Sequence, residues 1–238
     1  MDVNIDQLKK FQLEIAKSVV LEKKDYPLEY FEFIVGVDLT FNTNEGIVCF
    51  SVFDMNEKKM EYFFERDKIK FPYIPGFLAF RELPLINKLY EKLHKELFND
   101  KKVLFFIDGH GLSHPRKAGI ATHFGVLNNT FSIGIAKRLL YGKIQDENFF
   151  ENKQKLFSFV IDQNFSQIAV AIKTEYLKRK RIMNSKVLYI SVGNKLNLKN
   201  SFELFVNFYK KYNFIPTEEA HNYLQKIRKK KEYEKKLF

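Results

Sequence analysis

The sequence predicts an α/β fold in which a mixed β-sheet is flanked by helices. Segments 33–41, 46–55 and 60–69 alternate apolar and polar residues, as strands with one buried face do. A helical apolar stripe over 83–98 follows them, and the wholly apolar run 103–107 comes next. This order predicts an antiparallel three-stranded meander, joined through a helix to parallel strands.

The chain is expected to open with an amphipathic helix, because apolar residues recur at helical spacing over residues 5–20. The polar stretches 43–46 and 55–58 separate the three strand-like segments and have the composition of hairpin turns. A turn-rich loop, 72–82, leads into the predicted helix. Pro84 is tolerated only near the first turn of that helix, so the helix is expected to begin beside it.

The second half of the chain is expected to continue the sheet. A long glycine-rich loop follows the strand 103–107 and extends to residue 125. The order of elements is typical of a ribonuclease H-like fold. No repeat or Pro/Ser/Gly-rich linker divides the chain, so a single domain over residues 1–238 is expected. The later elements are predicted to be a strand over 130–137, strands near 167–177 and 186–192, a helix near 201–212, and a helix after Pro216 with Thr217 as N-cap.

Positive charge is concentrated in the C-terminal quarter of the chain. Residues 1–177 carry 24 basic and 24 acidic side chains, whereas residues 178–238 carry 16 and 5, so this basic region supplies the whole net charge of +11. Its two densest runs, 178–181 and 228–231, suit contact with a phosphate backbone. A solvated lysine-rich surface is an equally good explanation of the charge alone.

The chain has a single cysteine, and no apolar stretch approaches the roughly 18 residues of a membrane span. Cys49 lies in an alternating apolar segment and is expected to be a buried thiol in a reducing compartment. We therefore expect a cytoplasmic protein without membrane contact, acting as a monomer.

The segment FIDGHGLSHPRKAGIATHFG, residues 106–125, contains three of the five histidines and four of the ten glycines. It follows a buried strand at the sheet edge where open α/β sheets bind ligands. A zinc site formed by His110, His114 and His123 is a weaker interpretation, because a glycine and a proline interrupt the helical spacing that such a site uses. A glycine-rich loop instead favours close backbone approach to a nucleotide.

Three acidic residues are expected to meet at this edge. Asp38 lies within the first strand, Glu82 lies one helical turn before the apolar stripe 86–93, and Asp108 ends the strand 103–107. Three carboxylates together favour Mg²⁺ or Mn²⁺, hard cations that prefer oxygen ligands. Each residue also has a structural explanation, as a strand-end turn residue, a helix N-terminal charge and an Asp-Gly turn.

Six stretches match the motifs of a known family in order and spacing: VGVDLTF (35–41), PYIPGFLAFRELP (72–84), DGHGLSHPRKAGIATHFG (108–125), SIGIAK (132–137), YISVGN (189–194) and AH (220–221). Through them the chain resembles the endonuclease V family of deoxyinosine-specific nucleases. The resemblance implies a ribonuclease H-like, Mg²⁺-dependent endonuclease, with Mn²⁺ able to substitute. It would hydrolyse the second phosphodiester bond 3′ to hypoxanthine in DNA repair. The alternatives are an inosine-specific ribonuclease of the same family and a noncatalytic nucleic-acid-binding relative.

The resemblance also implies roles for particular residues. Asp38, Glu82 and Asp108 match the metal-binding carboxylates of the family, and Lys137 matches a charged active-site group that would stabilise charge on the phosphate. His114 matches a second charged group, and His221 the histidine of the C-terminal motif. The implied pocket for an extruded hypoxanthine is formed by Gly76, Leu78, Gly109, Gly111, His114, Gly119 and Ile120, and the implied wedge loop by Pro72, Tyr73, Ile74 and Pro75.

The C-terminal motif departs from the family pattern. The family's PxPTRxAH is FIPTEEAH here, residues 214–221, so Phe214 replaces a proline and Glu218 an arginine. A carboxylate at 218 is unexpected beside a polyanion. The dense lysines after residue 225 are expected to compensate for the missing charge, the alternative being a solvated terminal helix.

Overall fold

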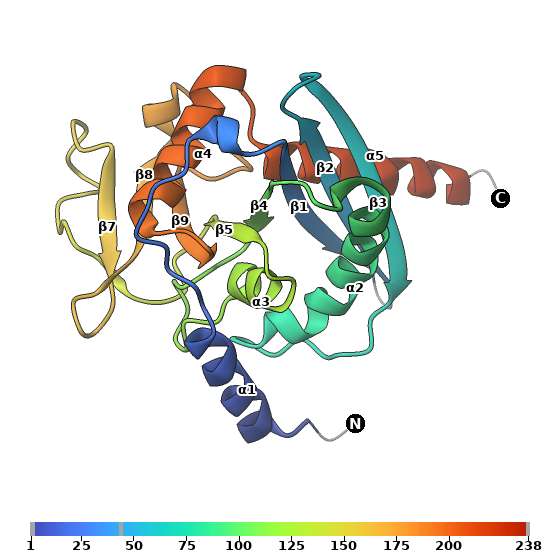
Figure 1. Ribbon diagram of the computed structural model, residues 1–238, viewed down its shortest axis with the longest axis horizontal. Coiled ribbons are helices and arrows are strands. Elements are labelled where there is room, and N and C mark those ends of the chain that lie inside the picture. The colour runs from blue at the N-terminus through green and yellow to red at the C-terminus, as the bar shows by residue number, and fades with distance from the viewer. Residues whose placement is uncertain (1–2, 43–44, 237–238) are drawn as a thin grey trace.

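The chain forms a nine-stranded sheet with helices packed against both faces (Figure 1). The computed structural model describes residues 3–42 and 45–236. The strand order is β3-β2-β1-β4-β5-β9-β8-β7-β6. The strands are β1 (Phe33–Phe41), β2 (Glu45–Asp54), β3 (Lys59–Lys68), β4 (Val103–Asp108), β5 (Phe131–Ala136), β6 (Lys143–Ile144), β7 (Phe157–Ile161), β8 (Gln167–Lys173) and β9 (Val187–Asn194).

Five α-helices and three short helical segments accompany the sheet in the described residues. In these residues no helix combines the length and the apolar character needed to cross a membrane. The α-helices are α1 (Ile5–Lys17), α2 (Leu78–Leu93), α3 (Ile120–Leu127), α4 (Leu198–Tyr212) and α5 (Pro216–Lys236), and the short segments are η1 (Leu28–Tyr30), η2 (His94–Phe98) and η3 (Thr174–Leu177).

The predicted mixed sheet is confirmed. Strands β1, β2 and β3 form an antiparallel meander, while β4 is parallel to β1 and β5 is parallel to β4. The remaining pairs are antiparallel, and they include the strands β6 and β7, which the sequence did not predict. The turn over 55–58 is present. Thr43 and Asn44 of the other predicted turn lie outside the described residues, and Glu45 and Gly46 belong to β2.

The glycine-rich loop is shorter than predicted, because its last part is the helix α3. Every residue from Ile120 to Gly125 is buried. A helix that is covered on all sides has no apolar stripe, so no helical period was visible in the sequence.

Helix α2 begins at Leu78, five residues before the predicted start, and Pro84 lies inside it rather than in its first turn. Proline removes one backbone hydrogen bond from a helix interior. Packing outweighs that loss here, because Ala79, Glu82 and Leu83 on the early turns are buried. The prediction for Thr217 is also wrong, because α5 starts at Pro216 and the buried Thr217 hydroxyl has no hydrogen-bond partner.

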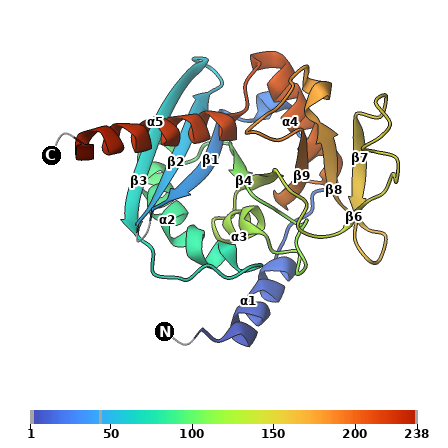
Figure 2. The same ribbon diagram turned by 180° about the vertical axis from the view of Figure 1, so that it is seen from behind.

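The alternating residues of the central strands form two separate apolar layers. Val35, Val37 and Ile107 pack with α2 and α3 on one face, whereas Ile34 and Phe106 pack with α4 on the other. Figure 2 shows α5 lying across β1, β2 and β3. The predicted buried thiol is confirmed: Cys49 is fully buried against residues of α5, and burial raises its pKa.

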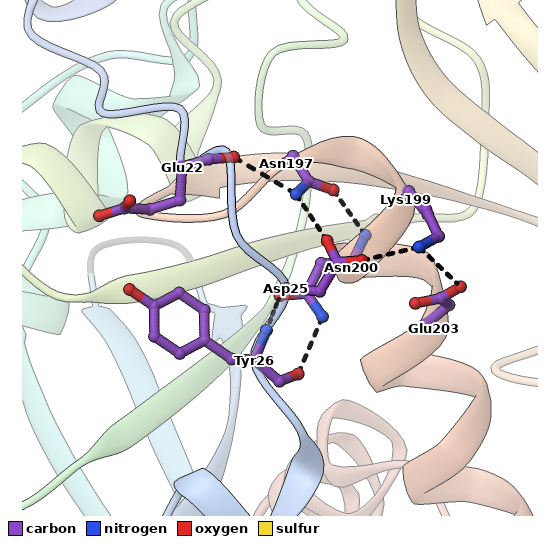
Figure 3. A network of polar contacts seen from close by, with 7 residues as sticks. All are labelled: Glu22, Asp25, Tyr26, Asn197, Lys199, Asn200 and Glu203. Carbon is purple, nitrogen blue, oxygen red and sulfur yellow. Dashed lines mark hydrogen bonds and ion pairs between the residues drawn. The ribbon is translucent and has the colours of Figure 1, made fainter.

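The segment between α1 and β1 is bound to the start of α4 by a polar network (Figure 3). The Asn200 side chain accepts a hydrogen bond from the Tyr26 amide at 3.0 Å and donates one to its carbonyl at 2.9 Å. The Asn197 side chain caps α4 by accepting a hydrogen bond from the Asn200 amide, and it also donates one to Asp25. Asp25 in turn forms an ion pair with Lys199 at 2.7 Å. These contacts fix the segment that connects α1 to the sheet.

Candidate active site

The strand register brings two of the predicted carboxylates side by side. Strands β1 and β4 run parallel, and the last residues of their paired region are Val37 and Ile107. Asp38 and Asp108 follow directly on these adjacent strands. Asp38 is 6% exposed, and the Asp108 side chain is 13% exposed. Glu82, on the second turn of α2, is 7% exposed and is the third acid at this edge.

The electrostatics show that the three carboxyl groups interact. The pKa of Glu82 is raised to about 8, mainly by burial and in addition by the charges of Asp108 and Asp38. Burial and Asp38 raise the pKa of Asp108 to about 7, while Lys137 opposes this shift. The structure therefore brings together the three acids that the sequence singled out.

Two basic side chains contact the strand carboxylates. Lys137 follows β5, and its Nζ lies 2.5 Å from Oδ2 of Asp108. His221 lies on α5, and its Nδ1 is 2.8 Å from Oδ2 of Asp38. That hydrogen bond to Asp38 raises the pKa of His221. Each strand carboxylate thus has one basic partner that holds its orientation.

The donor set suits a hard divalent cation, although the side chains do not form a closed ligand cluster. Among the described residues, no group of three or more His, Cys, Asp and Glu side chains is arranged to hold a metal ion. One oxygen of Asp38 and one of Asp108 instead face His221 and Lys137. Three buried carboxyl groups that repel one another are nevertheless the ligands that Mg²⁺ prefers, so the residues fit such an ion chemically.

We expect the stability of the metal-free protein to fall with increasing pH. The folded-state pKa of Glu82 is raised from 4.5 to about 8, so folding retains a proton that the unfolded chain releases in this range. In EDTA, the melting temperature should therefore decrease by several degrees between pH 5 and pH 8, and Glu82→Gln should remove part of the decrease. Mg²⁺ should raise the melting temperature more at pH 8 than at pH 6, because it competes with protons. The same dependence of melting temperature on pH in the wild type and in Glu82→Gln would contradict this prediction.

A cavity of about 440 Å³ adjoins the carboxylates, since Gly109, which follows Asp108, contributes to its wall. Tyr73, the residue expected to act as a wedge, lies at this cavity and is 68% exposed. Of the residues predicted to bind substrate, those that line the cavity are Tyr73, Pro75, Gly76, Leu78, Gly109, His114, Gly119 and Ile120. Gln12, Ala79, His110, Ala118, Arg138, Leu139 and Leu140 complete the lining, and the sequence did not single them out for it.

Three residues predicted to bind substrate do not line the cavity. Gly111 is held against β9, where its amide donates to the Ser191 hydroxyl at 2.8 Å. Pro72 and Ile74 belong to the same loop as Tyr73 but lie outside the cavity wall. The glycine-rich sequence alone could not separate residues that face a ligand from those that pack under the loop.

The carbonyl group of Gly76 joins the two loops that form the cavity. It accepts hydrogen bonds from Gln12 at 3.1 Å, His114 at 3.1 Å and Arg116 at 2.8 Å. Gly76 has φ +76°, a conformation that favours glycine. Gln12 is a polar residue on the buried side of α1. A polar residue at such a position was the one sequence feature that could have indicated its contact with Gly76.

The surroundings of His114 favour its neutral form in the free protein, and the charged role that the family resemblance implies stays a prediction. Its Nδ1 accepts a hydrogen bond from the Arg116 amide, so Nε2 carries the proton that is donated to Gly76. Burial and the nearby Arg116 lower the pKa of His114 to about 4. His123 packs against the rings of Phe11 and Phe80, and burial lowers its pKa to about 4 as well. Burial therefore favours the neutral form of both histidines, and His114 also lines the cavity.

The unexpected Glu218 has a partner in the basic region. Its carboxylate lies 3.1 Å from Nη2 of Arg179, in the first of the two basic runs. Lys178, Lys180 and Arg181 of the same run are exposed. In the second run, Arg228 donates to the Thr40 hydroxyl at 3.3 Å and therefore contacts β1 rather than solvent alone. Glu218 fixes one arginine of the first run beside the helix that carries His221.

Acidic residues on two adjacent parallel strands and on a flanking helix, in a mixed sheet of this order, define a ribonuclease H-like protein. Solved endonuclease V structures share the fold. One, from Ciona intestinalis, has a TM-score of 0.79 at 23% identity, covering 95% of this chain and 98% of that one. The catalytic domain of human endonuclease V has a TM-score of 0.78 at 23% identity, covering 95% and 96%.

Sequence comparison gives the family. The endonuclease V family model matches residues 13–222. Endonuclease V of Thermosipho melanesiensis is 38% identical over 198 residues, 82% of this chain and 80% of that protein. The Petrotoga mobilis enzyme is 33% identical over 233 residues, 96% of each chain. The chain belongs to the endonuclease V family, and it is a nuclease that hydrolyses phosphodiester bonds.

Proposed function

We propose that this protein is a Mg²⁺-dependent endonuclease that recognises hypoxanthine in nucleic acid and hydrolyses the second phosphodiester bond on its 3′ side, in DNA repair. One observation carries the proposal: the cavity lined by the predicted base-recognition residues adjoins the carboxylate site through Gly109. The Ciona intestinalis relative, solved with a 24mer DNA containing an inosine followed by a ribo-adenosine, supports nucleic acid of this kind as the substrate.

The residues around the phosphate would have distinct tasks. Asp38, Glu82 and Asp108 would hold the divalent cation, which when bound supplies positive charge to the attacked phosphate. The Lys137 ammonium group, already at the carboxylates, would donate to a phosphate oxygen as negative charge develops on it. His221 would keep the Asp38 carboxylate in place through its 2.8 Å hydrogen bond.

The base would be held apart from the cleavage chemistry. An extruded hypoxanthine would enter the cavity of about 440 Å³, where glycines leave backbone groups free to contact its edge. The Gly76 carbonyl is already used by three side chains, so it supports the wall rather than reading the base. Recognition and hydrolysis would thus depend on neighbouring but separate groups.

The test is cleavage of matched DNA and RNA oligonucleotides that carry a single inosine or an adenosine, with Mg²⁺, Mn²⁺ or EDTA. We expect metal-dependent nicking at the second bond 3′ to inosine in DNA. Preferential nicking of RNA would identify an inosine-specific ribonuclease, because one contact to a 2′-hydroxyl can distinguish the two. Selective binding in EDTA without nicking in any metal would identify a noncatalytic binder.

Removing the Tyr73 ring is expected to weaken recognition of the lesion. Tyr73 is 68% exposed at the cavity, so it can fill the gap left by a flipped base and stack on its neighbours. Tyr73→Ala should weaken binding of inosine-containing DNA by about 1–3 kcal/mol, the range for removing one base stack. The measurement is affinity for inosine and adenosine duplexes. Unchanged discrimination between them would exclude the wedge role.

The first basic run is expected to bind the backbone without reading the base. Changing Lys178, Lys180 and Arg181 to glutamine leaves the Arg179–Glu218 pair intact. Binding of inosine and adenosine duplexes should weaken together, and the log–log dependence on salt should flatten by up to about 0.9 for each phosphate that the protein no longer neutralises. Affinity measured across salt concentrations tests this. An unaltered slope would make these side chains solvated surface.

A further inference from the structure

The turn between β7 and β8 exposes the aromatic ring of Phe165. This side chain is 75% exposed, more than any other large hydrophobic side chain in the described part of the chain. Its backbone has φ +59°, a left-handed conformation that is uncommon for a bulky residue. Both the exposed ring and the backbone conformation are unfavourable unless the surrounding residues compensate for them.

The turn is held in this conformation by the buried residue Asp162. Its side chain is 2% exposed and accepts hydrogen bonds from the amides of Asn164 at 2.9 Å and Ser166 at 3.0 Å. The Phe165 amide donates to the Asp162 carbonyl at 3.0 Å. The ring is therefore presented to solvent by a well-bonded turn.

An ion pair joins this turn to the wall of the base cavity. Nζ of Lys117 lies 3.3 Å from Oδ2 of Asp162. Lys117 directly precedes Ala118 and Gly119, which line the cavity. The two ends of the contact are 45 residues apart in the sequence but adjacent in space, so the ion pair links the Phe165 turn to the loop that would receive the base.

A cation lies beside the ring, on a segment that follows a second part of the cavity wall. Nζ of Lys143 is 5.8 Å from the centre of the Phe165 ring. Lys143 pairs with Ile161 at the sheet edge, and it follows Leu139 and Leu140, which line the cavity. An exposed aromatic ring beside a lysine matches single-stranded nucleic acid, whose bases stack while its phosphates attract cations.

We propose that Phe165 is a second stacking residue, which packs against an unpaired base of the bound strand outside the cavity, with Lys143 beside an adjacent phosphate. This proposal rests on the proposed function, because it takes the substrate to be nucleic acid distorted around an extruded base. Phe165 and Tyr73 come from different elements, so each can engage a different base. Stacking on Phe165 is independent of base identity, since every base has an aromatic face.

The first test compares substitutions at Phe165 with a matched control. Phe150 is 64% exposed and lies in the segment before β7, whereas Phe165 lies in the turn after it, so Phe150 is a second exposed phenylalanine outside that turn. Phe165→Ala and Phe165→Leu should both weaken binding of single-stranded oligonucleotides about fivefold to a hundredfold. Phe165→Tyr should retain the affinity, and Phe150→Ala should leave it unchanged.

The second test uses the absence of tryptophan from the chain. Phe165→Trp supplies a single fluorescent reporter, and Phe150→Trp supplies its control. In an Asp38→Ala background that prevents cleavage, oligonucleotides with inosine or adenosine should both quench the fluorescence of the Phe165→Trp protein. They should leave that of the Phe150→Trp protein unchanged.

The outcomes separate this proposal from the proposed function. If inosine and adenosine oligonucleotides bind and are cleaved alike, the inosine function fails, while equal quenching by both would still support the stack. If the wild type is selective for inosine but Phe165→Ala binds normally and Phe165→Trp is not quenched, the stack is wrong. If Phe165→Ala loses affinity while Phe165→Leu retains it fully, the stacking proposal is also wrong. That result would mean that residue 165 makes an apolar contact, such as one with a protein partner, that needs no aromatic ring.

Discussion

Replacing either Asp38 or Asp108 by alanine is expected to abolish metal-dependent cleavage. These residues lie side by side at the ends of the paired region of β1 and β4, where Asp38 is buried and the Asp108 side chain is only 13% exposed. Removing one leaves too few oxygen ligands for a cation that must also bind the phosphate. Activity should fall below a few per cent of the wild-type rate, as measured on an inosine oligonucleotide with Mg²⁺.

The fold of these variants is expected to survive, because each substitution removes a repelling charge from the site. Asp108→Ala should bring the pKa of Glu82 closer to its ordinary value, since Asp108 contributes to raising it. Asp25→Ala is the matched control, an ion-paired aspartate in the network at the start of α4 (Figure 3). It should keep its activity. More than a few per cent of activity in Asp38→Ala or Asp108→Ala would remove that residue from the metal site.

The three acids could be predicted from the sequence because each is marked by local pattern. Asp38 lies on the more polar face of an alternating strand, and Asp108 ends an apolar one. Glu82 was correctly placed on the inward side of α2 even though the predicted start of that helix was wrong. The apolar stripe fixes the face of a helix more firmly than its first residue, because packing against the sheet can extend a helix past a proline.

The groups that position the cavity could not be predicted in this way. Gln12 and Arg116 both bond to the Gly76 carbonyl, although 64 and 40 residues separate them from it. Such long-range hydrogen bonds leave no periodic trace in the chain. The pairing of Glu218 with Arg179 is similar: the substitution was visible as an anomaly, but its partner lies 39 residues away, in a basic run whose sequence showed no sign of this contact.

Replacing Gly36 by alanine is expected to displace the first turn of α5. A Cβ atom at Gly36 would lie 2.0 Å from the carbonyl carbon of Pro216 and 2.1 Å from its oxygen, so the helix backbone would have to move. That oxygen also accepts a 2.6 Å hydrogen bond from Ser51, which pairs with Gly36 on β2. Overpacking against backbone should lower the free energy of unfolding by about 3 kcal/mol or more, measured by denaturant titration.

Displacing α5 should also reach the chemistry, because the same helix carries His221. Its hydrogen bond to Asp38 raises its pKa, so in Gly36→Ala that pKa should fall toward the ordinary value in a proton NMR titration, together with the cleavage rate. Gly46→Ala on β2 is the control, since its Cβ would meet only side-chain ends, Ile69 Cδ1 at 2.6 Å and Leu85 Cδ2 at 3.0 Å, which can rotate away. Equal destabilisation by the two substitutions, with an unchanged His221 pKa, would contradict this prediction. It would show that the position of His221 on α5 does not depend on a glycine at residue 36 of β1.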